Sequence, residues 1–311
     1  MKKVDVIIPV YKPTTELLRL LELLGRQTVP VNQVILINTE KEYFLPLISE
    51  DELAEKYPNV VLHHITKAEF DHGKTRNMGV KYSGTPYFVM MTDDAIPADE
   101  RLIEELLTPF DDEKVDMSYA RQLPAKGCGV IESYTRSFNY PEEGRVKTAE
   151  DLNTLGIKTF FASNVCAAYR KETFEKLGGF VNRTIFNEDM IYARRVIDNG
   201  GKIVYAASAR VYHSHNYSAV EQLHRNFDLG VSHAEYPEIF SGIATESEGM
   251  RLVKKSCKYL CQIKKPWLIV KLVWQSGFKY LGYFLGKRYG KFPKKLVKKL
   301  SMNKEYWRTQ G

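Results

Sequence analysis

The stretch Tyr87-Phe88-Val89-Met90-Met91-Thr92-Asp93-Asp94-Ala95-Ile96-Pro97 decides the fold and locates the chemistry. Its first five residues form an unbroken apolar run, which is typical of a parallel strand that is buried on both faces. Asp93 and Asp94 follow at the carboxyl end of that strand, where a doubly wound sheet binds its ligands. Carboxylates at this place suit a divalent cation that also holds phosphate oxygens. The structural alternative is a turn, because Asp is common in the turns that follow strands and Pro97 comes soon after.

Strands and helices alternate on both sides of this stretch. Upstream, apolar runs at 4–10, 34–37 and 60–65 predict strands, and leucines at helical spacing between Thr14 and Gly25 predict a helix. Further helices are predicted at 49–57, 74–82, 99–107, 171–177 and 189–198, and further strands at 115–120, 202–206 and 211–212. This alternation predicts an α/β fold with a mostly parallel, doubly wound (Rossmann-like) sheet. Residues 121–158 lose the periodicity and are expected to form a loop-rich excursion over the site.

The composition is that of an ordinary globular chain. The 311 residues are 44% hydrophobic and 27% charged, so a sizeable core can be buried. Four scattered cysteines cannot form a disulfide framework, which favours a reducing compartment. The positive start leads into an apolar run that Asp5 and Pro9 interrupt, so we expect a first strand and no signal peptide.

Charge divides the chain in two. Residues 251–311 contain 17 Lys and Arg and one acid, which gives this segment a net charge of +16. Because the whole chain has a net charge of +7, residues 1–250 have a net charge of −9. Trp267, Trp274 and many other apolar residues are interleaved with these cations. We therefore expect a main domain over 1–245 and a basic, amphipathic helical extension over 246–311.

Three interpretations of this extension are open. Its longest apolar run, 267–270, is far shorter than the ~20 residues that span a bilayer. Lys and Arg beside Trp, Tyr and Leu suit a helix that lies on an anionic membrane surface. A solvated helical cap is the structural alternative. A nucleic-acid groove is disfavoured because the rest of the chain is net acidic, so we expect a membrane surface and no nucleic acid as partner.

Acids also open a later helix, at Asn187-Glu188-Asp189. Capping and the helix dipole usually explain acids at such a place. The functional interpretation is a general base, a carboxylate that removes the proton of an acceptor hydroxyl. Because successive helical residues point about 100° apart, one acid can face a site while the other holds its neighbours.

Two further motifs can contact a donor or its metal. In His213-Ser214-His215, alternate strand residues share a face, so both imidazoles can point the same way, although two solvated histidines fit equally well. Residues 71–77 precede and begin the helix predicted at 74–82. They offer the cations Lys74 and Arg76, free backbone amides, and Gly73, where an anion can approach closely. Their spacing is not that of a P-loop.

Taken in order, these motifs resemble glycosyltransferase family 2. They are Val6-Ile7-Ile8-Pro9-Val10-Tyr11, Gly73 to Asn77, Asp93-Asp94 with Pro97, Leu177-Gly178-Gly179-Phe180 and Glu188-Asp189. The stretches 70–77, 91–97 and 211–218 are more narrowly similar to bacterial rhamnosyltransferases of surface polysaccharide assembly. The resemblance covers about residues 4–240. It implies the GT-A fold, a nucleotide-sugar donor, a Mn²⁺ or Mg²⁺ ion and inversion at the anomeric carbon.

The resemblance also implies roles for single residues. Asp189 matches the catalytic base and Glu188 its partner. Asp94 matches the metal-binding carboxylate, with Asp93 and His213 as further ligands, because Thr92 replaces the first acid of the usual Asp-x-Asp. The implied donor-binding residues are Pro9, Val10, Tyr11, Asn38, Thr39, Glu40, Gly73, Lys74, Arg76, Asn77, Asp93 and Arg225.

The implied reaction moves L-rhamnose from dTDP-L-rhamnose to a hydroxyl of a polyprenyl-linked saccharide. The implied address is the cytoplasm, with peripheral attachment to the inner face of the cell membrane. Asn38-Thr39-Glu40 departs from the Asp-Asp or Asp-Ser of many relatives, so a family 2 enzyme with a UDP-hexose donor is the closest alternative. A non-catalytic membrane- or polymer-binding relative is a second alternative. The sequence is also compatible with a homodimer.

Overall fold

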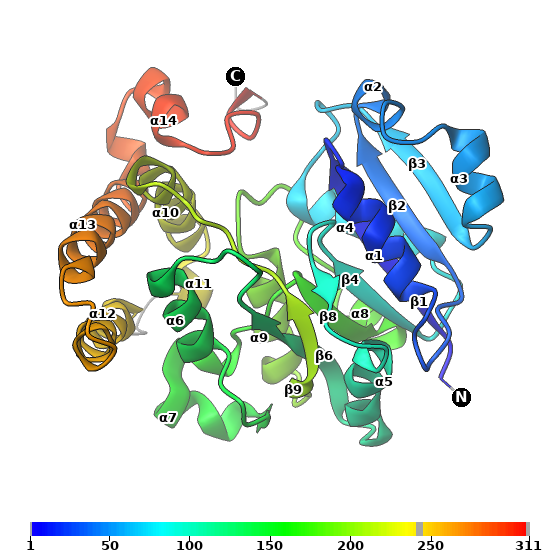
Figure 1. The fold of residues 1–311 in the computed structure, drawn as a ribbon, viewed down its shortest axis with the longest axis horizontal. Helices are drawn as coiled ribbons and strands as arrows, with labels where there is room; N and C mark the ends of the chain where they lie inside the picture. Colours follow the sequence, from blue (N-terminus) through cyan, green and yellow to red (C-terminus); the bar gives the residue numbers. More distant parts are fainter. Residues whose placement is uncertain (1, 241–244, 309–311) are drawn as a thin grey trace.

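A computed structural model describes residues 2–240 and 245–308. Its centre is one nine-stranded sheet in which eight strands follow the order β3-β2-β1-β4-β8-β6-β9-β5, with β7 on β9 (Figure 1). The first four strands of this order are parallel. They are β1 (Val4–Tyr11), β2 (Val34–Thr39), β3 (Val60–Ile65) and β4 (Tyr87–Met91). This half of the sheet confirms the predicted parallel alternation.

The second half of the sheet is mixed. β8 (Cys166–Arg170) runs antiparallel to both β4 and β6 (Val115–Leu123), while β9 (Lys202–Tyr212) is parallel to β6. Short strands β5 (Ile96–Pro97) and β7 (Arg145–Lys147) pair antiparallel with β9. β8 was not predicted because its alanines have little strand propensity. Strands 202–206 and 211–212 are one continuous strand.

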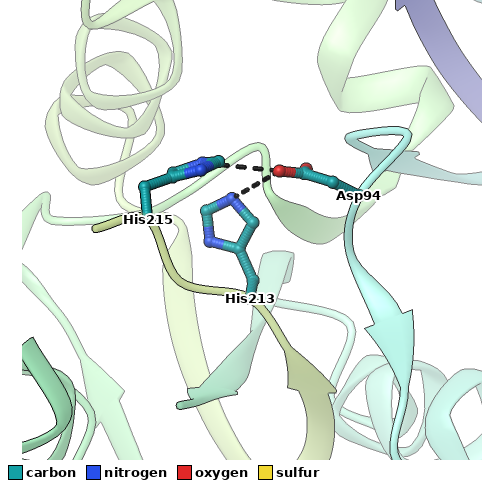
Figure 2. A group of neighbouring side chains, drawn as sticks. All are labelled: Asp94, His213 and His215. Carbon is teal, nitrogen blue, oxygen red and sulfur yellow. Dashed lines mark ion pairs between the residues drawn. The ribbon is translucent and has the colours of Figure 1, made fainter. Parts of the chain in front are cut away.

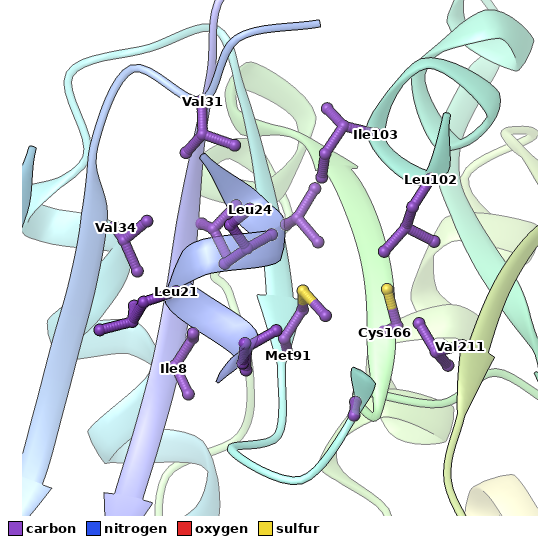
Figure 3. Packing of buried hydrophobic residues seen from close by; sticks show 14 of the residues in the cluster. Ile8, Leu21, Leu24, Val31, Val34, Met91, Leu102, Ile103, Cys166 and Val211 are labelled. Carbon is purple, nitrogen blue, oxygen red and sulfur yellow. The ribbon is translucent and has the colours of Figure 1, made fainter. Parts of the chain in front are cut away.

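Helices cover both faces of the sheet. On one face, Leu21 and Leu24 of α1 (Thr15–Leu24) pack over Ile8 and Met91 (Figure 3). The opposite face buries a second, aromatic-rich cluster. The remaining helices in this part are α2 (Lys41–Phe44), α3 (Glu50–Lys56), α4 (His72–Tyr82), α5 (Leu102–Leu107), α8 (Lys171–Lys176), α9 (Glu188–Asp198) and α11 (Pro237–Phe240).

The segment 121–158 is less irregular than predicted. It contains α6 (Val130–Asn139) and α7 (Leu152–Leu155). None of the α6 residues is buried, and the Tyr134 ring of α6 stacks on Tyr259 of α12 (Thr245–Gln262) at 4.3 Å between centroids. Ile131, Tyr134 and Phe138 recur at helical spacing, so the predicted loss of periodicity was wrong for this part of the segment.

The C-terminal helices pack beside α10 (Ala219–Glu235), away from α1 and α3 (Figure 1). They are α12, α13 (Leu268–Gly286) and α14 (Lys294–Leu300). α10 and α13 approach closely through glycines: a Cβ on Gly282 would lie 2.2 Å from the Leu223 carbonyl oxygen, and one on Gly286 would lie 2.1 Å from that of Phe227. The predicted boundary between 245 and 246 adjoins residues 241–244, which lie outside the described residues.

Residues 302–306, after α14, return toward the sheet. Met302 and Asn303 donate their backbone N–H groups to the Asp228 carboxylate, and the Tyr306 hydroxyl donates to Glu235. Lys67, after β3, lies 3.5 Å from Glu305. Within residues 2–240 and 245–308, no helix has the length and apolar character that crossing a membrane requires.

Candidate active site

One acid and two histidines meet beyond the ends of β4 and β9. Asp94 follows β4, and His213 and His215 follow β9, which pairs with the short β5 after Asp94. The Asp94 Oδ2 lies 3.5 Å from His213 Nε2 and 3.4 Å from His215 Nε2 (Figure 2). Among the described residues, these three are the group whose potential ligand atoms all lie within 4.8 Å of one another.

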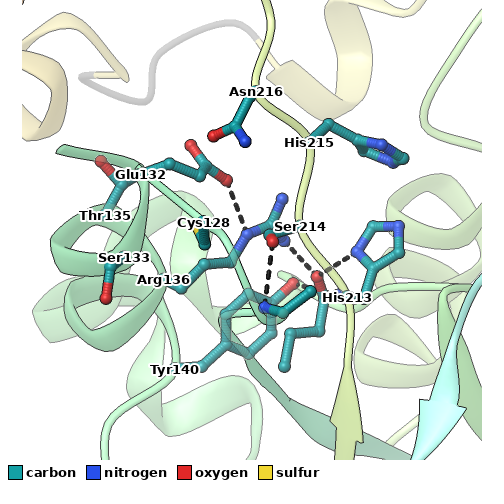
Figure 4. Close-up of polar contacts among 12 residues, drawn as sticks. Cys128, Glu132, Ser133, Thr135, Arg136, Tyr140, His213, Ser214, His215 and Asn216 are labelled. Carbon is teal, nitrogen blue, oxygen red and sulfur yellow. Dashed lines mark hydrogen bonds and ion pairs between the residues drawn. The ribbon is translucent and has the colours of Figure 1, made fainter. Parts of the chain in front are cut away.

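Gln122 of β6 fixes the orientation of His213. The Gln122 Oε1 accepts a hydrogen bond from Arg136, and guanidinium groups only donate, so this atom is an acceptor. His213 Nδ1 lies 3.0 Å from the same oxygen and therefore carries the proton (Figure 4). Burial lowers the pKa of His213 to about 3, so the ring is neutral. Its unprotonated Nε2 then points at Asp94.

This arrangement fits a divalent cation. The lone pair of His213 Nε2 and a carboxylate oxygen face each other, which is repulsive without a positive charge between them. An imidazole held by a hydrogen bond at its other nitrogen is the usual form of a metal-binding histidine. Two imidazoles and one carboxylate suit a transition ion such as Mn²⁺ better than Mg²⁺, which prefers oxygen.

Asp93, the other predicted metal ligand, is not part of this group. Its carboxyl is half-buried, and burial together with the charge of Asp94 raises its pKa to about 6. A hydrogen bond from the Tyr11 backbone opposes this rise. Asp93 therefore lies between the end of β1 and the Asp94 group.

The predicted acid pair is held at the start of α9, in a cleft of about 420 Å³ that the two histidines also line. Buried Glu188 contacts the Arg76 Nε at 3.3 Å and accepts a hydrogen bond from the Asn164 side chain at 3.0 Å. Asp189 accepts from the Asn164 backbone N–H at 3.0 Å. Both acids line the cleft: Glu188 is held by Arg76 and Asn164 side chains, whereas the Asp189 carboxylate accepts only backbone N–H groups.

The two acids differ in protonation. Burial and the charge of Glu188 raise the pKa of Asp189 to about 7. Burial also acts to raise the pKa of Glu188, but the Arg76 guanidinium, His72 and the Asn164 amide outweigh it, so its pKa lies below the ordinary value. Two neighbouring carboxyls whose environments push their pKa values apart are typical of an acid–base site. Asp189 is the group of the pair that can take a proton near neutral pH.

Besides Arg76, three further cations line the same cleft: Arg136, Arg225 and Lys279. Arg136 pairs with Glu132 at 2.8 Å (Figure 4). The Arg225 guanidinium lies over the Phe186 ring, 4.6 Å from its centroid, and no carboxylate of the described residues pairs with it. Arg225, predicted to hold a phosphate, therefore remains available to an anionic ligand.

The residues predicted at the donor nucleotide occupy the ends of β1 and β2. Tyr11 is exposed, and its ring meets that of Tyr43 edge to face at 5.7 Å. Lys12 lies 4.7 Å from the Tyr43 ring centroid. Pro9 and Val10 precede them on β1, and Thr39 is buried at the end of β2. The side-chain amide of buried Asn38 donates to the Glu40 carbonyl oxygen at 3.1 Å, so it stabilises the backbone at the end of β2.

The residues predicted on α4 divide into two kinds. Gly73 lies so close to Val181 that a Cβ would come within 1.8 Å of its carbonyl oxygen, and the Asn77 amide binds both backbone groups of Phe180. These two residues join α4 to the turn before α9. Arg76 reaches the cleft, where it holds Glu188, while Lys74 is exposed on the other side of the helix.

Four residues that contact the Asp94 group or the acid pair, or add charge to the cleft, were not among those predicted. His215 shares a strand face with His213, but its approach to Asp94 depends on the loop that contains Ser214 and Asn216 (Figure 4). The side chains of these two residues accept hydrogen bonds from the backbone N–H groups of Ala125 and Gly129, respectively. The other three are Gln122, Asn164 and Lys279. Nothing in their local sequence marks them, because their roles arise from contacts between distant segments.

Comparison with known proteins identifies a family and similar chains. The family model for glycosyl transferase family 2 matches residues 5–178. The O-antigen chain rhamnosyltransferase RfbN of Salmonella typhimurium is 37% identical over 310 residues, which cover 98% of this chain and 96% of that protein. The O-antigen chain rhamnosyltransferase WbaN of Salmonella anatum is 38% identical over 289 residues, which cover 91% of this chain and 88% of that protein.

Solved structures share the fold. The mannosyltransferase PcManGT from Pyrobaculum calidifontis, in complex with GDP-Man and Mn²⁺, has a TM-score of 0.57 at 15% identity, covering 98% of this chain and 85% of that one. TarS from S. aureus, in complex with UDP-GlcNAc, has a TM-score of 0.54 at 16% identity, covering 93% of this chain and 91% of that one. At this identity the similarity concerns the fold, which is the predicted GT-A arrangement.

Proposed function

The chain belongs to glycosyl transferase family 2, and we propose that it transfers L-rhamnose from dTDP-L-rhamnose, with inversion, to a hydroxyl of a lipid-linked saccharide during surface polysaccharide synthesis. The observation that carries the reaction class is the acid pair, in which Arg76 keeps Glu188 charged and Asp189 faces the cleft that His213 and His215 also line. The sugar is supported by the two rhamnosyltransferases, whose similarity extends along nearly the whole chain.

The reaction is a single displacement. The Asp189 carboxylate takes the proton of the acceptor hydroxyl, whose oxygen forms a bond to the anomeric carbon. The bond between that carbon and the diphosphate oxygen breaks, and dTDP leaves with the electron pair. Because the nucleophile attacks from the face opposite the leaving group, the anomeric configuration inverts. Asn164 supports this step by donating its backbone N–H to Asp189, which orients the carboxylate.

The chain's own residues also hold the donor. Asp94, His213 and His215 would bind a divalent ion, with Mn²⁺ favoured by the two imidazoles. When bound, such an ion offsets negative charge on the diphosphate. Arg225 would contact the diphosphate directly, since its position over Phe186 leaves its N–H groups toward the cleft. Tyr11, Lys12 and Glu40 would border the nucleoside at the ends of β1 and β2.

A panel of nucleotide sugars tests the donor assignment. The purified chain is incubated with Mn²⁺ and each donor in turn, with and without a lipid-linked saccharide, and release of nucleoside diphosphate is measured. Turnover with dTDP-L-rhamnose alone is the expected result. Turnover with a UDP-hexose instead would support the proposed reaction class but contradict the assignment of rhamnose as the transferred sugar. Absence of binding and turnover with every donor would favour the non-catalytic alternative.

We also propose that residues 246–311 attach the enzyme to an anionic membrane surface, which places 1–245 as the catalytic domain at the inner face of the cell membrane. The support is the outer face of α13, whose exposed apolar residues point away from α10: Trp267, Val270, Val273, Trp274, Tyr280, Leu281 and Phe284. Val270 is 76% exposed and Trp267 is 65% exposed. A symmetric dimer through this face would bring two strongly basic segments together, so a lipid surface fits it better than a second copy.

Vesicle binding tests this attachment. We expect the chain to sediment with vesicles that contain phosphatidylglycerol at low salt, and to bind less at high salt because screening weakens the cation–lipid attraction. Trp274→Ser should weaken binding by roughly tenfold, since burial of a large apolar side chain is lost. Val146→Ser, at an exposed apolar residue of β7, is the matched control. Equal binding by Trp274→Ser and the parent chain would contradict the proposal.

A further inference from the structure

A second cavity lies beside the catalytic cleft, between α6, α10, α12 and α13. Its volume is about 750 Å³, which is within the range of small-molecule pockets. Most of its wall is apolar and includes Ile131, Leu229, Leu252, Val253, Leu272 and Val273. A sugar or a nucleotide would leave its hydroxyls without partners against these walls, whereas a hydrocarbon chain would be desolvated favourably.

The cavity and the catalytic cleft share two lining residues, which we call the junction. Thr135 of α6 and Lys279 of α13 line both spaces. Asp189, His215 and Arg225 line the cleft on the other side of this junction. The shared residues therefore place the apolar cavity directly beside the catalytic cleft, with the Lys279 side chain bordering both.

The junction is positively charged. Lys279 makes no hydrogen bond or ion pair with the described part of the chain, and burial lowers its pKa even though Glu132 lies near it. The Glu132 carboxylate is already paired with Arg136. Arg136 and Arg225 add two further positive charges around Lys279. Three cations against one carboxylate at the end of an apolar cavity are suited to a phosphate group.

The outer end of the cavity opens on the outer face of α13. Val273 and Tyr280 line the cavity, yet they are 56% and 57% exposed. Gly277 lies between them, and a Cβ added there would meet no atom within 4 Å. The open side of the cavity thus coincides with the surface proposed to lie on the membrane.

We propose that this cavity binds the hydrocarbon chain of a lipid-linked acceptor, with the lipid phosphate at Lys279 and the saccharide directed toward Asp189. The proposal rests on the proposed function and specifies the acceptor's own site. A lipid held in this way would leave the bilayer at the outer face of α13, and its first phosphate would be desolvated beside Lys279. The chemistry recognised is therefore an isoprenoid or alkyl chain that ends in a phosphate.

Binding of farnesyl diphosphate tests the cavity directly. Its affinity for the full chain is measured by titration calorimetry, with inorganic pyrophosphate and farnesol as the two half-ligands. We expect farnesyl diphosphate to bind and each half-ligand to bind at least roughly tenfold more weakly, because each lacks one set of contacts. Equal affinity for pyrophosphate would overturn the proposal, since the cavity would then add nothing.

Two variants and one control locate the binding. Ser276→Trp fills the cavity from α13, and Lys279→Met removes the cation while keeping the length of the side chain. Each should weaken binding of farnesyl diphosphate by roughly tenfold or more. Ser137→Trp makes the same substitution at an exposed position of α6 outside the cavity and should leave the affinity unchanged. Unaltered affinity in both Ser276→Trp and Lys279→Met would refute the site.

A separate measurement keeps this test independent of the proposed function. Binding of dTDP with Mn²⁺ is followed in the same samples, because it reports the donor site and the folded state. If dTDP does not bind the parent chain, the proposed donor is wrong, while the farnesyl diphosphate result still decides the cavity. If Ser276→Trp loses dTDP binding together with farnesyl diphosphate binding, the assignment of the lipid to this separate cavity is contradicted.

Discussion

Replacing Asp189 by Asn is expected to lower kcat by about 10²–10⁴-fold, the usual contribution of a general base. The amide cannot accept the proton of the acceptor hydroxyl, although it keeps the shape of the carboxyl and can still accept the Asn164 N–H. Donor binding should change little, since the cation site and Arg225 are untouched. The measurement is steady-state transfer of rhamnose together with the dissociation constant of dTDP.

The same substitution should raise thermal stability at neutral and higher pH. Burial and Glu188 raise the pKa of Asp189 to about 7, above its unfolded value, so the folded state binds more protons between these two values and stability increases as pH falls. The Asn side chain carries no buried charge at any pH. The melting temperature of Asp189→Asn should therefore exceed that of the parent most clearly above pH 7, and the difference should shrink in acid.

Asp198→Asn is the matched control for this pair of effects. Asp198 ends the same helix, and its carboxylate is paired with Arg194 at the surface. We expect near-parental kcat and a small loss of stability, because exposed ion pairs contribute little. A parental kcat in Asp189→Asn would show that Asp189 is not the general base. For the parent enzyme, kcat/KM should rise with pH through the region near 7, since activity needs the carboxylate.

Replacing Asp94 by Asn is expected to weaken Mn²⁺ binding by at least about 100-fold. The neutral amide removes the negative charge that attracts the cation, and the neutral imidazoles of His213 and His215 alone make a poor site for a hard cation. The free Mn²⁺ signal in electron paramagnetic resonance measures binding without reliance on turnover. Transfer from the donor should fall in parallel.

Two further variants test the geometry of this site. Gln122→Leu removes the acceptor that orients His213, so we expect Mn²⁺ affinity to fall by about 10- to 100-fold. Asp99→Asn, which loses an exposed ion pair with Arg210, should bind Mn²⁺ like the parent chain. Parental Mn²⁺ affinity in Asp94→Asn would show that the ion, if bound, is held elsewhere.

The parts of the fold that local patterns specify could be predicted. The apolar run before Asp93 identified β4, and the alternation around it identified the parallel half of the sheet. The acid pair at the start of α9 was also visible, because a strand-and-helix pattern fixes where such residues lie. Lys74 to Asn77 were placed on the right helix, but only contacts with Glu188 and Phe180 separate Arg76 from Asn77 in role.

Features that depend on distant segments could not be predicted in this way. The apolar spacing of α6 is helical, but its packing partner α12 follows it by more than a hundred residues and could not be read from the local pattern. The tautomer of His213 depends on its hydrogen bond to Gln122. The orientation of the Asp189 carboxylate depends on the backbone N–H of Asn164. The cavity beside the cleft exists only because helices from both parts of the chain enclose it.

Inverting transfer of rhamnose by a single displacement fixes the configuration of the product. Nuclear magnetic resonance measures that configuration in the product formed from dTDP-L-rhamnose and a lipid-linked saccharide in the presence of Mn²⁺. We expect a new rhamnosyl linkage whose anomeric configuration is opposite to that of the donor, and no such product with Asp189→Asn. A product that retains the donor's configuration, or the same product formed at the parental rate by Asp189→Asn, would contradict this mechanism.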